Sequence, residues 1–368
     1  MPTDASISAD ERIKSESFTT RMMKRPELGA IGGVILVTVF FLITADSAMF
    51  TLSGIMNFMT PAAQLGILGI AAAMLMIGGE FDLSIGSMVA FAGMIFGVFT
   101  VNLGLPLIVA IPFTLAFAAA IGAVNGMIVI RTGLPSFIVT LAGLFILRGA
   151  SLVGLKLFTG GSTQLRGVRD AVEGDMLAPI FSGEAFGFLF SWLAQMGLIE
   201  TFKSGTPKVP GIPVEILWFI ALALVATYVL LRTSAGNWIF ATGGDSNAAK
   251  NSGVPVTRVK ISLFMLTAMA AALVAIITVI DAGSTDARRG FMKEFEAIIT
   301  AVIGGCLLTG GYGSAIGAFF GAIIFGMVTI GLTYTNFDQD WFQVFLGGML
   351  LLAVVFNNVI RKRVTGER

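Results

Sequence analysis

The chain has 368 residues, of which 56% are hydrophobic and only 12% are charged. Soluble domains carry about 25% charged residues, so this composition excludes a soluble globular protein and indicates a chain that crosses a membrane many times. A net charge of +1 argues against nucleic acid as a partner. The chain has no histidine and a single cysteine, Cys306, so we expect no disulfide, no metal site and no cofactor.

Long apolar runs recur along the chain without the alternation that marks a membrane barrel, and this pattern favours helices. Ten runs lie at about 29–45, 61–77, 84–101, 105–130, 134–152, 215–231, 259–281, 296–309, 314–334 and 341–360. We therefore predict an all-α polytopic membrane protein with about ten transmembrane helices. Its transmembrane domain covers 29–360, between an N-terminal tail at 1–28 and a C-terminal tail at 361–368.

Lysine and arginine indicate the orientation, because they are enriched in cytoplasmic loops. They gather in both tails and in the loop at 232–260, which places both termini in the cytoplasm. A long outer loop then covers 153–214. Its apolar stretch 185–199 is short for a span and would invert everything after it, so we expect an interfacial or re-entrant helix there.

The loop at 232–258 contains a short polar segment with the signals of a capped helix. Asp245 suits the N-cap, where it accepts from the first N–H groups, and residues 246–252 form about two turns. Gly253 suits the left-handed position after the last turn, and Pro255 prevents continuation. So short a helix is marginal alone in water, and we expect it to be presented at the membrane face to a partner.

The segment 77–87 joins the second and third spans and holds two carboxylates, Glu80 and Asp82. One interpretation is a short cytoplasmic turn with solvated acids, in which Ser84 caps the next helix. The other is a broken-helix turn that lines a translocation pathway, because irregular backbone at membrane depth must lie against a cavity or protein. Its Ile-Gly-Gly start and Gly-Ser end recur at 303–314, which allows an ancient duplication.

Other polar residues lie at helix starts or within apolar runs. Pro135 suits a first helical turn and Ser136 can satisfy its N–H groups, either in an ordinary span or in a half-helix directed at a cavity. Arg148 and three amides lie near or within spans, where the amides can bond across helices or to a hydroxyl group of a solute. The charged outer segment 281–296 is a solvated loop or a docking surface. The pathway candidates are Asn57, Gln64, Asp82, Ser84, Asn125 and Ser136.

Three classes of function fit a chain of this composition. The chain contains no Gly-x-x-x-x-Gly-Lys-Ser/Thr motif, so the ATP-driven work of an importer must come from another chain. An ion-coupled secondary transporter of a small polar solute is the alternative, but a relay of buried acids is not evident. A membrane enzyme would need clustered catalytic groups, and we expect no catalytic residues.

The segment 78–87 reads Gly-Gly-Glu-Phe-Asp-Leu-Ser-Ile-Gly-Ser. It resembles the signature Gly-Gly-x-Asp-Leu-Ser-x-Gly-Ser of bacterial ABC sugar permeases of the ribose/xylose type, with Glu80 and Phe81 where the family has one residue. Segments 134–143 and 295–305 resemble the family's next block and its eighth-span block. Segment 243–254 is similar to its cytoplasmic coupling loop, with Asp245 where Asn is common. The blocks appear in order between about 55 and 360, and the loop 153–214 is longer than in the family.

The resemblance implies a transport subunit, not an enzyme, that moves a ribose- or xylose-like monosaccharide into the cytoplasm. It implies a multi-pass protein of the bacterial inner membrane, paired with a second permease subunit as a homodimer or a related heterodimer. A periplasmic sugar-binding protein would deliver the sugar, and a cytosolic ABC ATPase would bind the coupling loop. The coupling residues that the resemblance implies are Gly243, Gly244, Asp245, Ala248, Ala249, Lys250 and Gly253.

The predicted orientation can be tested by cysteine labelling in a Cys306→Ala background. A cysteine at Asp170, in the outer loop, should react with a membrane-impermeant maleimide added to intact cells. A cysteine at Lys250 should react only after the membrane has been opened. Labelling of Lys250→Cys in intact cells would overturn the orientation.

Overall fold

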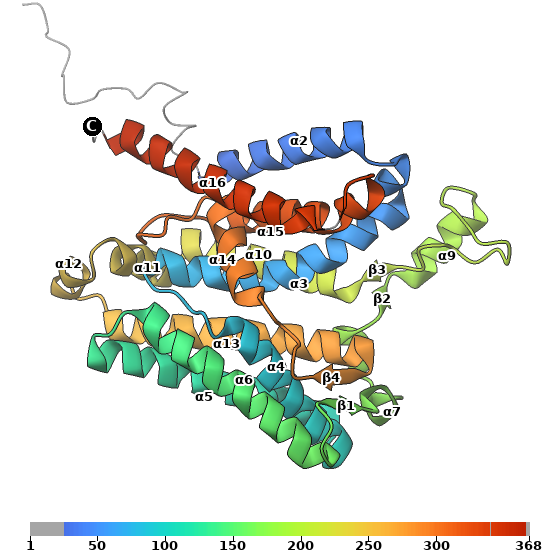
Figure 1. The fold of residues 1–368 in the computed structure, drawn as a ribbon, viewed down its shortest axis with the longest axis horizontal. Helices are drawn as coiled ribbons and strands as arrows, with labels where there is room; N and C mark the ends of the chain where they lie inside the picture. Colours follow the sequence, from blue (N-terminus) through green and yellow to red (C-terminus); the bar gives the residue numbers. More distant parts are fainter. Residues whose placement is uncertain (1–25, 339, 366–368) are drawn as a thin grey trace, which may run out of the picture.

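The computed structural model describes the backbone of residues 26–338 and 340–365 and the side chains of residues 27–338 and 340–355. Long helices run side by side, and short strands gather at one end of the bundle (Figure 1). The main helices are α2 (Pro26–Thr44), α3 (Leu52–Ile77), α4 (Ile85–Gly97), α5 (Leu107–Thr132), α6 (Ser136–Thr159), α10 (Val214–Arg232), α11 (Ser234–Gly244), α12 (Ser246–Asn251), α13 (Val256–Ala282), α14 (Lys293–Ile303), α15 (Ala315–Gly331) and α16 (Trp341–Thr365). The all-α prediction is confirmed.

The predicted tails lie mostly outside the described residues. Helix α2 begins at Pro26, inside the N-terminal segment 1–28, and residues before it are not described. Helix α16 continues to Thr365, so five residues of the predicted C-terminal tail at 361–368 are helical.

Helix α3 lies at the centre of the bundle, and most of its residues are buried. Helices α10, α13, α14 and α15 all pack on it. Gly66 and Gly69 of α3 allow this, because Phe219 of α10 and Thr300 of α14 occupy the space where their side chains would be. Helix α2 covers α15, whereas α4 and α5 cover α13 and α6 lies against α4. The result is two layers, joined through α3 and α13 (Figure 1).

Eight helices in the described part of the chain are long and apolar enough to cross a membrane. The predicted span 296–309 is wrong, because α14 has 11 residues and ends at Ile303. Eleven residues of helix extend about 16 Å, roughly half of the hydrocarbon core. The predicted span 341–360 falls in α16, and the part of this helix whose side chains are described, Trp341–Val355, is a shorter apolar helix.

The long loop contains short elements at the end of the bundle opposite α12. Strand β1 (Gln164–Arg166) pairs antiparallel with β4 (Ser284–Asp286), and β2 (Glu184–Ala185) pairs with β3 (Ile212–Pro213). Helices α7 (Val168–Val172), α8 (Ala178–Phe181) and α9 (Gly187–Gln195) lie between them. Together with β2 and β3, α9 forms an arm that projects from the bundle (Figure 1). Its nine residues are too few for an eleventh span, and its insertion into the membrane surface stays a prediction.

Candidate functional site

The chain leaves α3 through two glycines and reaches α4 as an extended segment, residues 78–84, which we call the crossing loop. Helix α3 ends at Ile77 because Gly79 takes a positive φ of 84°. The N–H groups of Gly79 and Glu80 bond back to the carbonyls of Met76 and Leu75 at 2.9 and 3.2 Å. Figure 1 shows the crossing loop running from the α11 end of the bundle to its middle, where α4 begins.

Helix α6 satisfies the backbone of the crossing loop. The N–H of Phe81 donates to Ser136 Oγ, and the N–H of Leu83 donates to Thr140 Oγ1, both at 3.0 Å. A membrane offers no water for such groups, so protein side chains must replace it. Glu80 and Asp82 are only 8% and 6% exposed, so the interpretation of a turn with solvated acids is wrong.

Asp82 is the centre of a buried hydrogen-bond network. Its Oδ1 accepts from the N–H and the Oγ of Ser84 at 2.8 and 2.6 Å, and its Oδ2 accepts from Thr267 Oγ1 of α13 at 2.6 Å. Asn125 of α5 donates to Ser84 Oγ at 3.2 Å. Ser84 occupies the N-cap position of α4 but makes no side-chain cap bond, so the predicted cap is wrong. Asp82 binds its hydroxyl instead.

The crossing loop and its partners bring together four of the six pathway candidates, namely Asp82, Ser84, Asn125 and Ser136. The other two lie elsewhere along α3. Asn57 Nδ2 donates to the hydroxyl of Tyr334 at 3.1 Å. Gln64 lies beside the carboxylate of Glu215, at the start of α10. The structure therefore joins the candidates of the crossing loop and separates Asn57 and Gln64 from them.

Helix α13 holds the crossing loop at two points. Lys260 Nζ lies 2.5 Å from Glu80 Oε1, and Thr267 donates to Asp82. The sequence candidates include neither Thr140 nor Thr267, because a threonine in an apolar run usually bonds only its own helix. The sequence could have indicated Lys260 as a partner of the crossing loop, because two carboxylates between apolar runs need a cation or strong hydrogen-bond donors nearby.

Helix α12 matches the predicted capped helix. Asp245 Oδ1 accepts from the N–H groups of Asn247 and Ala248 at 2.9 and 3.0 Å, and Gly253 has a φ of 86°. Ala248 and Lys250 are exposed, whereas Ala249 is only 5% exposed and packs against its own chain. The expectation that Ala249 faces a partner is therefore wrong for this conformation, and Ala248 is the small residue on the surface.

Helix α11 reaches the crossing loop through a contact between backbones, formed by Gly79, Gly243, Gly310 and Gly311, which we call the glycine contact. A Cβ at Gly243 would collide with the carbonyl oxygen of Ile77 and lie 2.7 Å from the nitrogen of Gly311. That carbonyl accepts from the N–H of Gly311 at 2.9 Å. The end of α11, the start of the crossing loop and the loop after α14 thus meet without side chains between them.

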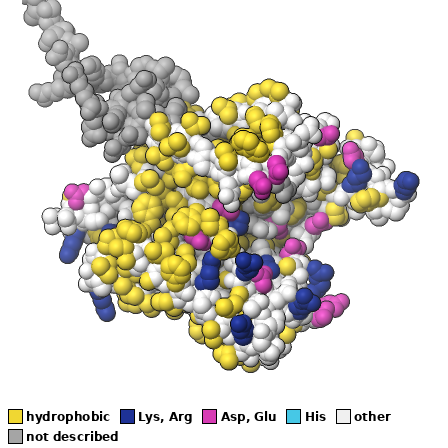
Figure 2. Space-filling view, in the orientation of Figure 1, with side chains coloured by type: hydrophobic (Ala, Val, Ile, Leu, Met, Phe, Trp, Pro, Cys, Tyr) yellow, Lys and Arg dark blue, Asp and Glu magenta, His cyan; other side chains and the backbone are white. Residues whose placement is uncertain are grey.

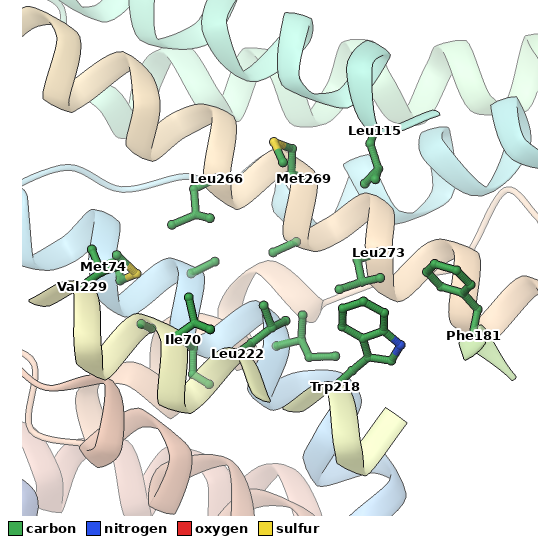
Figure 3. A pocket seen from close by; sticks show the side chains of 15 residues that line it. Ile70, Met74, Leu115, Phe181, Trp218, Leu222, Val229, Leu266, Met269 and Leu273 are labelled. Carbon is green, nitrogen blue, oxygen red and sulfur yellow. The ribbon is translucent and has the colours of Figure 1, made fainter. Parts of the chain in front are cut away.

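An apolar cavity of about 400 Å³ lies among α3, α10 and α13. Figure 3 shows Trp218 and Phe181 at one end and Met74 and Val229 at the other. Every lining side chain is hydrophobic apart from the indole N–H of Trp218, which donates to the carbonyl of Ile180. The cavity therefore offers no partner for the hydroxyl groups of a polar solute.

Comparison with known proteins identifies relatives along nearly the whole chain. Residues 54–354 match the family model described as "Branched-chain amino acid transport system / permease component". The chain is 30% identical to the xylose transport system permease protein XylH of Escherichia coli, over 90% of this chain and 92% of that protein. It is 30% identical to the ribose import permease protein RbsC of Escherichia coli, over 88% and 91% of the two chains. It is 31% identical to the fructose import permease protein FrcC of Rhizobium meliloti, over 90% and 82%.

The glycine contact predicts a large difference between two adjacent substitutions. Gly243→Ala should lower the free energy of unfolding by about 1–3 kcal/mol, because the new methyl group overfills a closed contact. Gly244→Ala is the matched control, because a Cβ there meets nothing within 4 Å. The thermal midpoints of the purified variants, followed by tryptophan fluorescence, measure the difference. Equal midpoints would show that the contact is loose.

Proposed function

The chain belongs to the family of branched-chain amino acid transport system permease components, and on that premise we propose that it is the membrane-spanning permease subunit of an ATP-driven importer that moves a monosaccharide into the cytoplasm. The match over residues 54–354 supports the permease role. The relatives named for xylose, ribose and fructose support a monosaccharide as the substrate.

The observation that carries the mechanism is the double connection between α12 and the crossing loop. Helix α12 follows α11, whose Gly243 contacts the start of the crossing loop, and it precedes α13, whose Lys260 and Thr267 bind Glu80 and Asp82. A displacement of α12 therefore moves both supports of the crossing loop together. This is the connection that an importer needs between a surface element and a pathway inside the membrane.

The partners follow from this assignment. The chain has no nucleotide-binding motif, so a separate cytosolic ABC ATPase subunit binds α12 and supplies the energy. The exposed coupling residues for this contact are Gly244, Asp245, Ala248, Lys250 and Gly253. The α12 end of the bundle and both termini then lie in the cytoplasm, in the bacterial inner membrane. A periplasmic sugar-binding protein approaches the opposite end, and a second permease subunit completes the pathway.

The coupling role of α12 is tested by Ala248→Trp. A bulky side chain on this exposed face should block the approach of an ATPase while the protein still inserts. We expect loss of copurification with the ATPase subunit and loss of ATP-dependent uptake of radiolabelled xylose, ribose or fructose in proteoliposomes. Ser204→Trp, exposed on the arm at the other end of the bundle, is the control and should keep ATPase binding. Full ATPase binding by Ala248→Trp would exclude α12 as the coupling element, and uptake without any ATPase would favour an ion-coupled transporter.

The role of the crossing loop is tested by Asp82→Asn. The amide oxygen can still accept from Ser84, and the amide nitrogen can donate to the Thr267 hydroxyl, so we expect near-normal abundance in the membrane. Uptake should fall, because the substitution removes the charge that attracts both donors. Quantitative immunoblots of membranes and uptake assays separate the two effects. Normal uptake at normal abundance would leave Asp82 with a purely structural role.

A further inference from the structure

Two short helices, α4 and α14, begin against each other in the middle of the bundle. A Cβ at Gly86, in the first turn of α4, would collide with the carboxylate of Glu294, in the first turn of α14. Gly290, just before α14, packs on the carbonyl of Gly86. Figure 1 shows that the chain reaches α4 from the α11 end and α14 from the opposite end. The positive ends of both helices therefore meet at one place.

Three side chains from this junction have buried polar atoms without a hydrogen-bond partner. Glu294 is 3% exposed, and its Oε2 has no partner. Ser87, the next residue of α4, is fully buried, and its Oγ has no partner. Arg148 of α6 acts electrostatically on Glu294, yet its Nε and Nη2 are buried without a partner. Nearly all buried polar atoms in proteins have a hydrogen-bond partner, so a cluster of exceptions needs an explanation, and a functional role is one.

The surface beside this cluster is not suited to lipid. The guanidinium of Arg148 lies 5.0 Å from the ring centroid of Phe291, which is 59% exposed. Lys293 and Glu296 form an ion pair at 2.6 Å on the same turn of α14. Figure 2 shows basic and acidic side chains gathered in the middle of this face, beside hydrophobic areas. Charged groups at that depth are costly against hydrocarbon, so this face meets water or another subunit.

We propose that Glu294, Ser87 and Arg148 form a binding station for the hydroxyl groups of the sugar on its way through the membrane. The inference rests on the proposed function and names the site at which that function's substrate is held. A carboxylate only accepts, a guanidinium only donates and a serine does both. Two neighbouring sugar hydroxyls do both as well, so one sugar can donate to Glu294 while it accepts from Arg148. The exposed ring of Phe291 offers an apolar surface to the C–H side of the sugar.

The station is closed in this conformation. Gly86 fills the space in front of Glu294 Oε2, so a sugar can enter only when α4 and α14 move apart. Helix α4 follows the crossing loop directly, and the crossing loop is connected to α12 as described above. A displacement of α12 is therefore a route by which the station opens.

The first test is Glu294→Gln, which keeps the shape of the side chain and removes its charge. We expect ATP-dependent sugar uptake in proteoliposomes to fall at least about tenfold, because the free energy of one hydrogen bond to a charged group corresponds to a factor of about ten. The thermal midpoint should stay close to that of wild type, because Oε2 has no hydrogen bond to lose and the lower cost of burying a neutral amide offsets the lost attraction to Arg148. Ser87→Ala gives a second variant with the same expectation. Glu296→Gln, two residues away and paired with Lys293, is the matched control and should stay within about twofold of wild type.

Unchanged uptake in Glu294→Gln and Ser87→Ala would overturn the station, and so would a fall in uptake that a lower midpoint explains. Failure of the wild-type complex to import any of the three sugars with ATP would overturn the proposed function instead.

The second test identifies the ligand without the ATPase or the binding protein. Millimolar xylose, ribose or fructose should raise the thermal midpoint of the purified wild-type permease, because a ligand of the folded state stabilises it. Glu294→Gln should lose this shift, and Glu296→Gln should keep it. A shift with leucine and none with the sugars would overturn the assignment, because Glu294 and Arg148 would then hold the two charges of an amino acid. A sugar shift retained by Glu294→Gln would also overturn it.

Discussion

The structure depends on one requirement, that irregular backbone inside a membrane finds its hydrogen-bond partners in the protein. The crossing loop meets it with hydroxyls from α6, and its carboxylates are held by α13. These bonds fix where α6 and α13 must pack, and hence where α4 can begin. A break in a helix at this depth is tolerated only while all of them are made. Any movement of the loop must therefore exchange these bonds for others, which favours discrete states over gradual bending.

Contact between backbones explains how movement could reach the loop from the surface. Side chains at an interface can change rotamer and absorb a small shift, but Gly243 meets Ile77 and Gly311 with no side chain between them. A displacement of α11 would therefore act directly on the backbone of the crossing loop. The ion pair between Lys260 and Glu80 and the bond from Thr267 to Asp82 act on the same loop from α13. A backbone contact on the α11 side and side-chain bonds on the α13 side make the position of α12 and that of the crossing loop interdependent.

The sequence predicted the features that rest on local chemistry. Apolar runs gave most of the spans, and Asp245 and Gly253 gave the ends of α12, because a cap and a left-handed glycine act within one turn. It could not predict that α14 ends at Ile303, since Cys306, Leu307 and Leu308 continue the apolar run beyond the end of the helix. It also missed Glu294, which stands among other charges in a segment that looks like a solvated loop. Glu294 is buried because it contacts Gly86, more than two hundred residues earlier in the chain. The sequence around Glu294 cannot predict a contact over that separation.

The two Ile-Gly-Gly segments end their helices in the same way but lead to different places in the bundle. Both α3 and α14 end with the same pair of bonds, in which Gly79 and Gly305 donate to the carbonyls of Met76 and Val302, and the next N–H groups reach one residue further back. The chains then diverge. Helix α15 begins beside the end of α14, where Gly317 packs on Gly304, whereas α4 begins half a bundle away from the end of α3 (Figure 1). The shared helix end follows from the requirement for a left-handed glycine after the last turn, while the place of the next helix is set by what each segment packs against.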